Sequence, residues 1–231
     1  MMEFRYDIHV HCSENSKCSP CPGAQIAAGY ADAGYTGFVM TNHFLAGYGP
    51  AYSPEDWERE CRGFMTGWQN AKEVGDARGI DVFFGWEYNY RGADLLTYGL
   101  GLDFLLAHPD MTTWHANRYF DEVHAAGGYI IHAHPFRQTG YIESIQLFPD
   151  KTDAVEVYNG SHYAPVYSPA FNDRALWYAK TFHKVQTAGS DTHGLSFGLP
   201  HRGGSMLFPR RPASVQEMID LIRNNRFRIE V

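Results

Sequence analysis

Short apolar runs alternate with helical patterns along this chain, and this alternation limits the fold more than any other feature. Strands are predicted at residues 4–10, 36–41, 81–86, 129–133, 153–157, 184–188 and 204–208, with a further extended piece at 95–100. Helices are predicted at residues 24–34, 53–78, 113–126, 168–181 and 214–222. Alternation of this kind is typical of parallel βαβ units. About seven units in 231 residues, without a linker or repeat, predict one α/β barrel with irregular closure, as a single domain over residues 1–231.

Composition agrees with one large core. Hydrophobic residues make up 44% of the chain and aromatic residues 15%, which is enough to fill a barrel of this size. The net charge of −7, without a Lys/Arg-rich run, argues against nucleic acid as the main partner. We find no signal-peptide pattern and no apolar run of about 20 residues, so no membrane span is expected and the expected location is the cytoplasm.

Histidine and acidic residues stand where the predicted strands end. His9 and His11 lie two residues apart on the first strand, so they share a face. Four later strands end in the same residue types, at His43, Glu87, His134, Asp191 and His193. In an α/β barrel the carboxyl ends of the strands converge on one mouth, where sites are built. Five strands ending this way predict a metal site.

The chemistry of these side chains narrows the metal and the reaction. Imidazole nitrogens with a few carboxylates suit Zn²⁺, Mn²⁺ or Fe²⁺ better than Mg²⁺ or Ca²⁺, which prefer oxygen ligands. Seven candidate ligands exceed what one tetrahedral ion uses, so we expect two ions with a bridging carboxylate. Such a site lowers the pKa of bound water and clamps the attacked and leaving oxygens. The expected chemistry is hydrolysis.

Five short motifs, taken together, resemble those of the PHP (polymerase and histidinol phosphatase) family. They are Asp7-Ile8-His9-Val10-His11, Thr41-Asn42-His43, Gly85-Trp86-Glu87, His132-Ala133-His134-Pro135 and Gly189-Ser190-Asp191-Thr192-His193. The resemblance implies a distorted (β/α)7 barrel, a site of two or three metal ions, and phosphoesterase activity. It also implies that the seven strand-end residues are ligands and that Glu87 bridges two ions.

The sequence departs from this family in two places. Many members carry a further His or Asp in the loop after the first motif, where this chain has Ser16, Lys17 and Cys18. Members with three ions carry another His beyond the third strand, but residues 98–103 contain none, and His108 lies too far on. We therefore expect two ions, with a third position left open. Lys17 could be a fixed charge or a solvated loop residue, and Cys18 an extra ligand or a loop thiol.

Several neighbouring residues are expected to support the site. Asp7 is predicted to accept a hydrogen bond from a ligand imidazole, which would fix its tautomer. His132 shares a strand face with His134 and either packs there or binds metal. Arg137 is the first choice for a phosphate contact, with a surface salt bridge as the alternative; His201 and Arg202 are second choices. Either Glu156 or Tyr158 is expected to line the pocket.

The leading hypothesis is a metal-dependent phosphoesterase that hydrolyses a small phosphate monoester or phosphodiester. In it Arg137 holds a non-bridging oxygen, and Asp191 or His193 manages the proton. The small phosphorylated substrate would be the main partner. The alternatives are a hydrolase of an amide or other non-phosphate bond, a nuclease acting on 3′ ends, and a non-catalytic metal-binding module.

Overall fold

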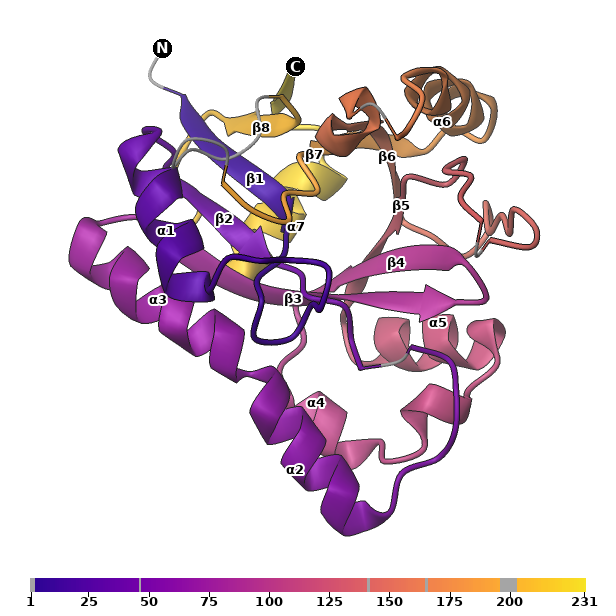
Figure 1. Cartoon of the computed structure of the whole chain (residues 1–231). Coiled ribbons are helices and arrows are strands. Elements are labelled where there is room, and N and C mark those ends of the chain that lie inside the picture. The colour runs from indigo at the N-terminus through magenta and orange to yellow at the C-terminus, as the bar shows by residue number, and fades with distance from the viewer. Residues whose placement is uncertain (1–2, 46, 141, 165, 196–202) are drawn as a thin grey trace.

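The computed structural model of the chain describes residues 3–45, 47–140, 142–164, 166–195 and 203–231 (Figure 1). The strands are β1 (Phe4–Val10), β2 (Gly37–Met40), β3 (Asp81–Tyr90), β4 (Ala93–Tyr98), β5 (Tyr129–Ala133), β6 (Ala154–Asn159), β7 (Val185–Gly189), β8 (Ser205–Phe208) and β9 (Arg228–Glu230). The α-helices are α1 (Gly23–Asp32), α2 (Pro54–Phe64), α3 (Thr66–Arg78), α4 (Leu102–Ala107), α5 (Ala116–Ala125), α6 (Ala170–Thr181) and α7 (Val215–Arg223). Short 3₁₀ turns cover Met111–Thr113 and Gly160–Tyr163.

The strands form one sheet that curls into a nearly closed barrel, which confirms the predicted fold class. Their order is β7-β6-β5-β4-β3-β2-β1-β8-β9. The strands β1 to β3 are parallel to one another, and so are β5 to β7. The gap between β7 and β1 is bridged at Val10 and Thr192, where the amide of His11 donates to the carbonyl of Thr192 at 2.9 Å.

The barrel is distorted because β4 runs antiparallel to both of its neighbours. A two-residue turn, Arg91-Gly92, joins it to β3, and both residues have positive φ (51° and 90°). Two such residues favour a tight hairpin over a helical crossover. The hairpin also lengthens β3. Glu87 therefore lies inside β3, although the sequence had predicted it at the end of that strand.

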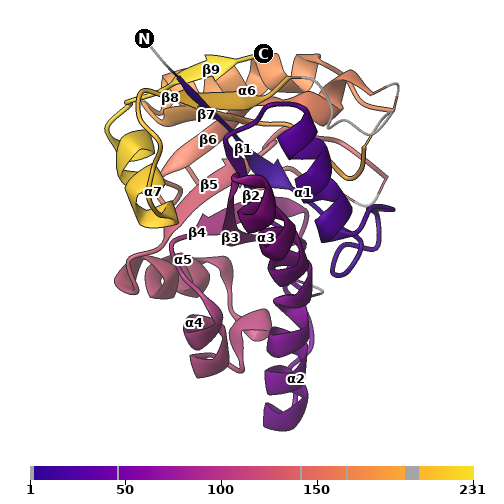
Figure 2. The same ribbon diagram turned by 90° about the vertical axis from the view of Figure 1, so that its left-hand side faces the viewer.

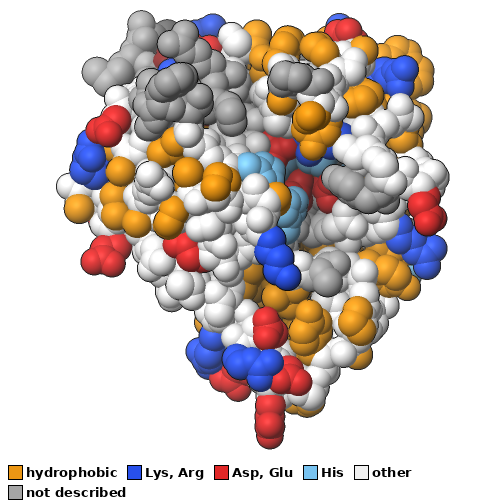
Figure 3. Space-filling view, viewed as in Figure 1, with side chains coloured by type: hydrophobic (Ala, Val, Ile, Leu, Met, Phe, Trp, Pro, Cys, Tyr) orange, Lys and Arg blue, Asp and Glu red, His pale blue; other side chains and the backbone are white. Residues whose placement is uncertain are grey.

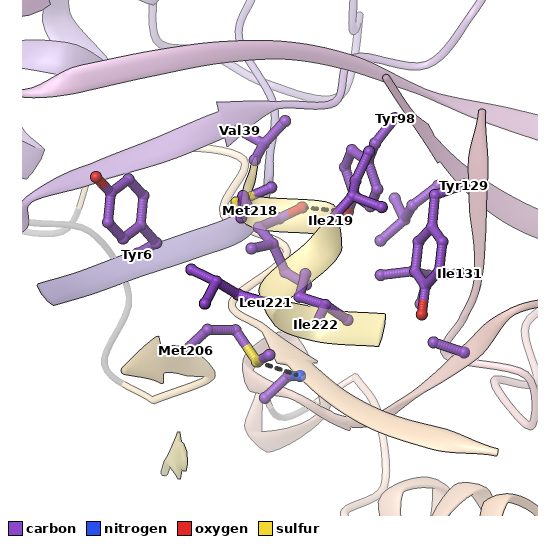
Figure 4. Packing of buried hydrophobic residues seen from close by; sticks show 14 of the residues in the cluster. Tyr6, Val39, Tyr98, Tyr129, Ile131, Met206, Met218, Ile219, Leu221 and Ile222 are labelled. Carbon is purple, nitrogen blue, oxygen red and sulfur yellow. Dashed lines mark hydrogen bonds between the residues drawn. The ribbon is translucent and has the colours of Figure 1, made fainter. Parts of the chain in front are cut away.

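Helix α7 fills one end of the barrel (Figure 4). Ser214 caps it by accepting a hydrogen bond from the amide of Glu217 at 3.2 Å. Its buried residues Met218 and Ile222 join a cluster with residues from the beginning of the parallel strands, such as Tyr129. The helix therefore closes the end where the parallel strands begin, and leaves the other end for the site.

Helices α1, α3, α5 and α6 lie on the outside of the sheet, whereas α2 and α4 extend beyond it and pack against each other (Figure 2). Helices α1 and α3 lie beside each other over the first strands, and α6 covers β6. The helix predicted at residues 53–78 is two helices, interrupted by a turn at Met65, whose amide donates to the carbonyl of Arg62 at 3.2 Å. Among the described residues, no helix is long and apolar enough to cross a membrane.

Candidate metal centre

The seven predicted ligands meet at the open mouth of the barrel. Their nitrogen and oxygen atoms form three overlapping groups, in each of which all the atoms lie within 4.8 Å of one another. The groups are His9/Glu87/His134, His9/His11/Asp191 and His11/His43/His193. Figure 3 shows histidine and acidic side chains on the floor of a hollow in this face. The structure thus brings all seven side chains together at one end of the barrel.

Glu87 stands between two sets of imidazoles. Its Oε1 lies 3.3 Å from Nε2 of His9 and 3.1 Å from Nε2 of His134. Its Oε2 lies 2.7 Å from Nδ1 of His43 and 3.6 Å from Nε2 of His11. The two oxygens of this carboxylate therefore face different histidine pairs.

The buried polar atoms of the centre fit a metal ion. Nε2 of His9, Nε2 of His11, Oε2 of Glu87 and Oδ1 of Asp191 are buried and have no hydrogen-bond partner among the described residues. The short approach between Glu87 and His43 does not have hydrogen-bond alignment, so it leaves Oε2 unsatisfied. A buried polar atom without a partner is costly. Four such atoms of ligand type, converging on one place, match the donor set that a divalent cation needs.

Carboxylates lie next to histidine and arginine side chains in the centre, and these neighbours shift one another's pKa values. Burial alone would raise the pKa values of both carboxyls, but His43 and His9 hold the pKa of Glu87 well below its ordinary value. Arg137 and His9 do the same to the pKa of Asp191. Burial would lower the pKa of His9, yet nearby carboxylates raise it well above that of a free imidazole. Without metal, the centre therefore pairs carboxylates with imidazolium groups, whose protons a divalent cation can replace.

Glu156 orients one of the histidines, a role the sequence did not assign to it. Its Oε1 lies 2.8 Å from Nδ1 of His9, which leaves Nε2 of that ring for the centre. Its Oε2 accepts from the amide of His134 at 3.0 Å and from Asn159 at 2.9 Å. A carboxylate behind a ligand imidazole fixes the tautomer and the ring orientation.

The prediction for Asp7 was wrong, because its carboxylate does not contact an imidazole. It accepts from the amides of His9 at 3.1 Å and Ser190 at 3.0 Å, and from the hydroxyl of Tyr30 at 2.5 Å. The register of β1 against β2 shifts between Asp7 and Val10, so simple alternation of side chains does not hold there. Asp7 therefore ties β1 to the start of the loop after β7.

Arg137 lies in a buried network and not in a surface salt bridge. Its Nη2 donates to the carboxylate of Asp191, to Oδ1 of Asn159 at 3.1 Å and to Oγ of Ser161 at 2.8 Å. Its Nε donates to Nε2 of His162 at 3.2 Å. Only Nη1 has no hydrogen-bond partner among the described residues. The guanidinium therefore holds Asp191 in place and keeps one nitrogen for another ligand.

Two of the histidines that the sequence left open lie outside the centre. His132 packs between Phe148 and Tyr178, with ring centroids 6.0 and 6.1 Å away, and burial lowers its pKa to about 3. Nδ1 of His108 donates to the carbonyl of Phe104 at 2.7 Å. Neither belongs to a potential metal group among the described residues. His132 is thus a neutral packing residue.

The loop after β1 brings Lys17 and Cys18 to the mouth of the barrel. Both are exposed and line the cavity beside the centre. Burial would raise the pKa of the Cys18 thiol, but hydrogen bonds from His193 and His43 lower it to about 6. His201 and Arg202 lie outside the described residues.

Asp94 is a carboxylate at the centre that the sequence did not reveal. It is buried on β4, where Oδ1 accepts from Asn89 at 2.6 Å and Oδ2 lies 3.9 Å from Nδ1 of His134. Burial and the charge of Glu87 raise its pKa. The only signal in the sequence was an acid inside an otherwise apolar segment, since hairpin pairing and not a strand end places it here.

Gly189 keeps the space that His9 and Glu156 occupy. A Cβ at this position would lie 2.5 Å from Cβ of His9 and 2.7 Å from Oε1 of Glu156. We expect Gly189→Ala to cost about 1–3 kcal/mol of stability and to weaken metal binding by about 10- to 100-fold, because it displaces the His9–Glu156 pair. Urea unfolding and metal titration measure the two effects.

Gly101→Ala is the matched control, since a Cβ at Gly101 has no neighbour within 4 Å. Gly101→Ala should leave both the stability and the metal affinity unchanged. If Gly189→Ala and Gly101→Ala had the same stability and the same metal affinity, the placement of His9 against Gly189 would be contradicted.

Solved structures share this fold. A two-domain protein from Bacteroides vulgatus ATCC 8482, containing a predicted PHP-like metal-dependent phosphoesterase, matches 98% of this chain with a TM-score of 0.67 and 16% identity. This chain spans 64% of the length of that structure. PsfC from Pseudomonas syringae PB-5123 matches 95% of this chain and 88% of its own, with a TM-score of 0.66 and 18% identity.

An amidohydrolase from Chromobacterium violaceum, solved with bound sulfate and no metal, matches 97% of each chain with a TM-score of 0.55 and 13% identity. No family model and no curated protein matches this sequence. At these identities the likeness concerns the fold alone. At that level it confirms the resemblance to PHP-like proteins in fold.

Proposed function

From a fold shared with PHP-like metal-dependent phosphoesterases, we propose that this protein hydrolyses small phosphate monoesters or phosphodiesters with two divalent ions, Zn²⁺, Mn²⁺ or Fe²⁺. The proposed ligands are His9, His11, His43, Glu87, His134, Asp191 and His193. The observation that carries the proposal is the set of four buried atoms without partners that converge on the mouth of the barrel.

The overlap of the three ligand groups supports two ions. His9 and His11 each have one ring nitrogen to offer an ion. Nδ1 of His9 is bound to Glu156, and Nδ1 of His11 faces Oγ of Ser16 at 3.3 Å. The group His9/His11/Asp191 would therefore draw on the same ring nitrogens as the other two groups. Only two groups share no residue: His9/Glu87/His134 and His11/His43/His193. Glu87 reaches both of them, as does Oδ1 of Asp191, 3.5 Å from His9 and 3.3 Å from His11.

Bound divalent ions supply a Lewis acid and lower the pKa of water at such a site. The protein side chains do the rest. Arg137 orients Asp191, and we assign its free Nη1 to a non-bridging phosphoryl oxygen. His193 is partly exposed, and its Nδ1 donates to the carbonyl of Asp191 at 3.0 Å, so His193 or Asp191 is the proposed carrier of the proton to the leaving oxygen.

Metal analysis and a substrate panel test the proposal together. Protein purified without added metal should contain about two ions per chain by ICP mass spectrometry. A panel of phosphate monoesters and diesters should show hydrolysis that EDTA abolishes and Mn²⁺ or Zn²⁺ restores. Absence of metal, with no activation by either ion, would refute it.

A second candidate is hydrolysis of an amide or another non-phosphate bond. The structural likeness to an amidohydrolase favours keeping this candidate, since the same metal centre can activate water toward a carbonyl carbon. Amide and lactone panels run beside the phosphate panel separate the two reactions. If every panel fails while metal removal unfolds the protein, a non-catalytic metal-binding role is supported instead.

Metal binding should release protons and tighten as the pH rises. Glu87 raises the pKa of His43 to about 11 against the effect of burial, and the pKa of His9 is also raised, so both imidazoles are protonated near pH 7 without metal. A metal must displace these protons, so its affinity falls as the pH is lowered. Titration calorimetry in two buffers of different ionisation enthalpy should show release of about two protons. Equal heats in the two buffers would contradict this.

A further inference from the structure

A cavity of about 830 Å³ opens beside the proposed metal centre. His43, Glu87 and Asp94 stand in its wall at the end next to the centre. Leu45 and Tyr52 stand in the rest of the wall, over the buried rings of Phe44 and Phe64. In Figure 3, hydrophobic side chains gather below the hollow that holds the histidines, beyond one basic side chain at its edge. The volume is that of a typical small-molecule site and far exceeds what a phosphate group alone would fill.

Several polar groups in the wall are already used within the protein, whereas Lys17 and Cys18 are exposed. Glu14 accepts from the amide of Gly23 at 2.9 Å and from Asn70 at 3.0 Å. Asn15 donates to the carbonyl of Gly63 at 3.2 Å and accepts from a neighbouring asparagine at the same distance.

Asn89 is committed in the same way. It donates to Asp94 at 2.6 Å and accepts from the amide of Gly92 at 3.2 Å. Apart from the exposed Lys17 and Cys18, the wall therefore offers few free partners to a polyhydroxylated ligand, and an apolar ligand would leave these internal hydrogen bonds intact.

The apolar part of the wall is held rigidly. Leu45 is half-buried and has φ of 46°, a conformation that is costly for a branched side chain. Tyr52 packs against Trp57 with ring centroids 5.8 Å apart. Trp57 is itself fixed by a hydrogen bond from Nε1 to the carbonyl of Leu105 at 2.6 Å. Leu45 and Tyr52 thus present preformed apolar surface to whatever lies next to the metal centre.

We propose that this cavity binds the leaving group of the substrate, and that this group is an aromatic or other ring-bearing apolar alcohol recognised by Leu45 and Tyr52. The inference rests on the proposed phosphoesterase function. In the reaction, water adds to phosphorus and the ester P–O bond breaks. The leaving oxygen takes up the proton that the attacking water gives up, so a monoester yields the ring-bearing alcohol and inorganic phosphate, and a diester yields the alcohol and a phosphate monoester.

Binding of two non-hydrolysable phosphonates to the Mn²⁺-loaded protein tests the proposal. Phenylphosphonate and methylphosphonate carry the same anionic group and differ in the ring. Because the ring would bury apolar surface against the cavity wall, phenylphosphonate should bind about 10- to 100-fold more tightly by calorimetry. Tyr52→Ala should weaken phenylphosphonate by about tenfold and leave methylphosphonate unchanged.

Trp177→Ala is the matched aromatic control, since Trp177 is 61% exposed on α6 and does not line the cavity. It should change neither affinity. Leu45→Ala provides a second variant should Tyr52→Ala fail to fold. The ratio of the wild-type affinities for phenylphosphonate and methylphosphonate already decides whether the cavity favours a ring.

The outcomes separate the two levels of inference. If both phosphonates bind equally, the ring-binding role of the cavity is refuted while the phosphoesterase proposal stands. If neither phosphonate binds and no phosphate ester is hydrolysed, the proposed function and this inference fail together.

Discussion

Replacing Glu87 with Gln should remove bound metal and lower kcat/KM by about a thousandfold or more. The expected loss is large because each carboxylate oxygen faces a different pair of imidazoles, so one substitution weakens both proposed ion positions. Gln has nearly the same shape but no charge and only one acceptor oxygen. ICP mass spectrometry gives the metal content, and steady-state kinetics on the best phosphate ester gives the rate.

Glu58→Gln is a matched control for this prediction. Glu58 pairs with Arg62 at the surface, does not line the cavity and belongs to none of the potential metal groups among the described residues. It should keep the wild-type metal content and change kcat/KM by less than about twofold. A Glu87→Gln variant that retained two ions and full activity would overturn the bridging role.

Loss of Arg137 should destabilise the metal-free protein by about 3–5 kcal/mol, because it leaves the charge of Asp191 buried without its partner. Both side chains are more than nine-tenths buried, and a single nitrogen, Nη2, reaches Asp191, Asn159 and Ser161. Arg137→Met keeps most of the volume and removes the charge. Urea unfolding of EDTA-treated protein at pH 7 measures the change.

The double variant Arg137→Met/Asp191→Asn tests the cause. Removing the second charge should recover most of the lost stability, because no unpaired ion then remains buried. Additive losses in the double variant would show that Arg137 acts by packing and not through Asp191. The double variant should still bind metal poorly, since Asp191 is a proposed ligand.

The positions of the seven candidate ligands could be predicted because the barrel itself brings them together. His9 lies near the end of β1, and His43 and His134 follow β2 and β5; they are far apart in the sequence, yet parallel strands deliver their carboxyl ends to one mouth. Short-range patterns located those strands to within a few residues. The ligand assignment itself stays a prediction until metal is measured.

The supporting residues could not be predicted in the same way. Asp94 reaches the centre only because β4 runs antiparallel between two parallel blocks, a reversal set by the short turn at Arg91 and Gly92. Asp7 misses the imidazoles because the register of β1 shifts beside it. Alternation along one strand carries no information about either event.

By itself the sequence determined the barrel class, the mouth that carries the site and the residue types that gather there. These follow from local periodicity and from the general geometry of parallel βα units. Only the tertiary structure decided which atoms meet: that each oxygen of Glu87 faces its own histidine pair, and that Glu156 contacts His9 across 147 residues of chain. Such contacts depend on strand register and side-chain packing between distant segments, which no single segment encodes.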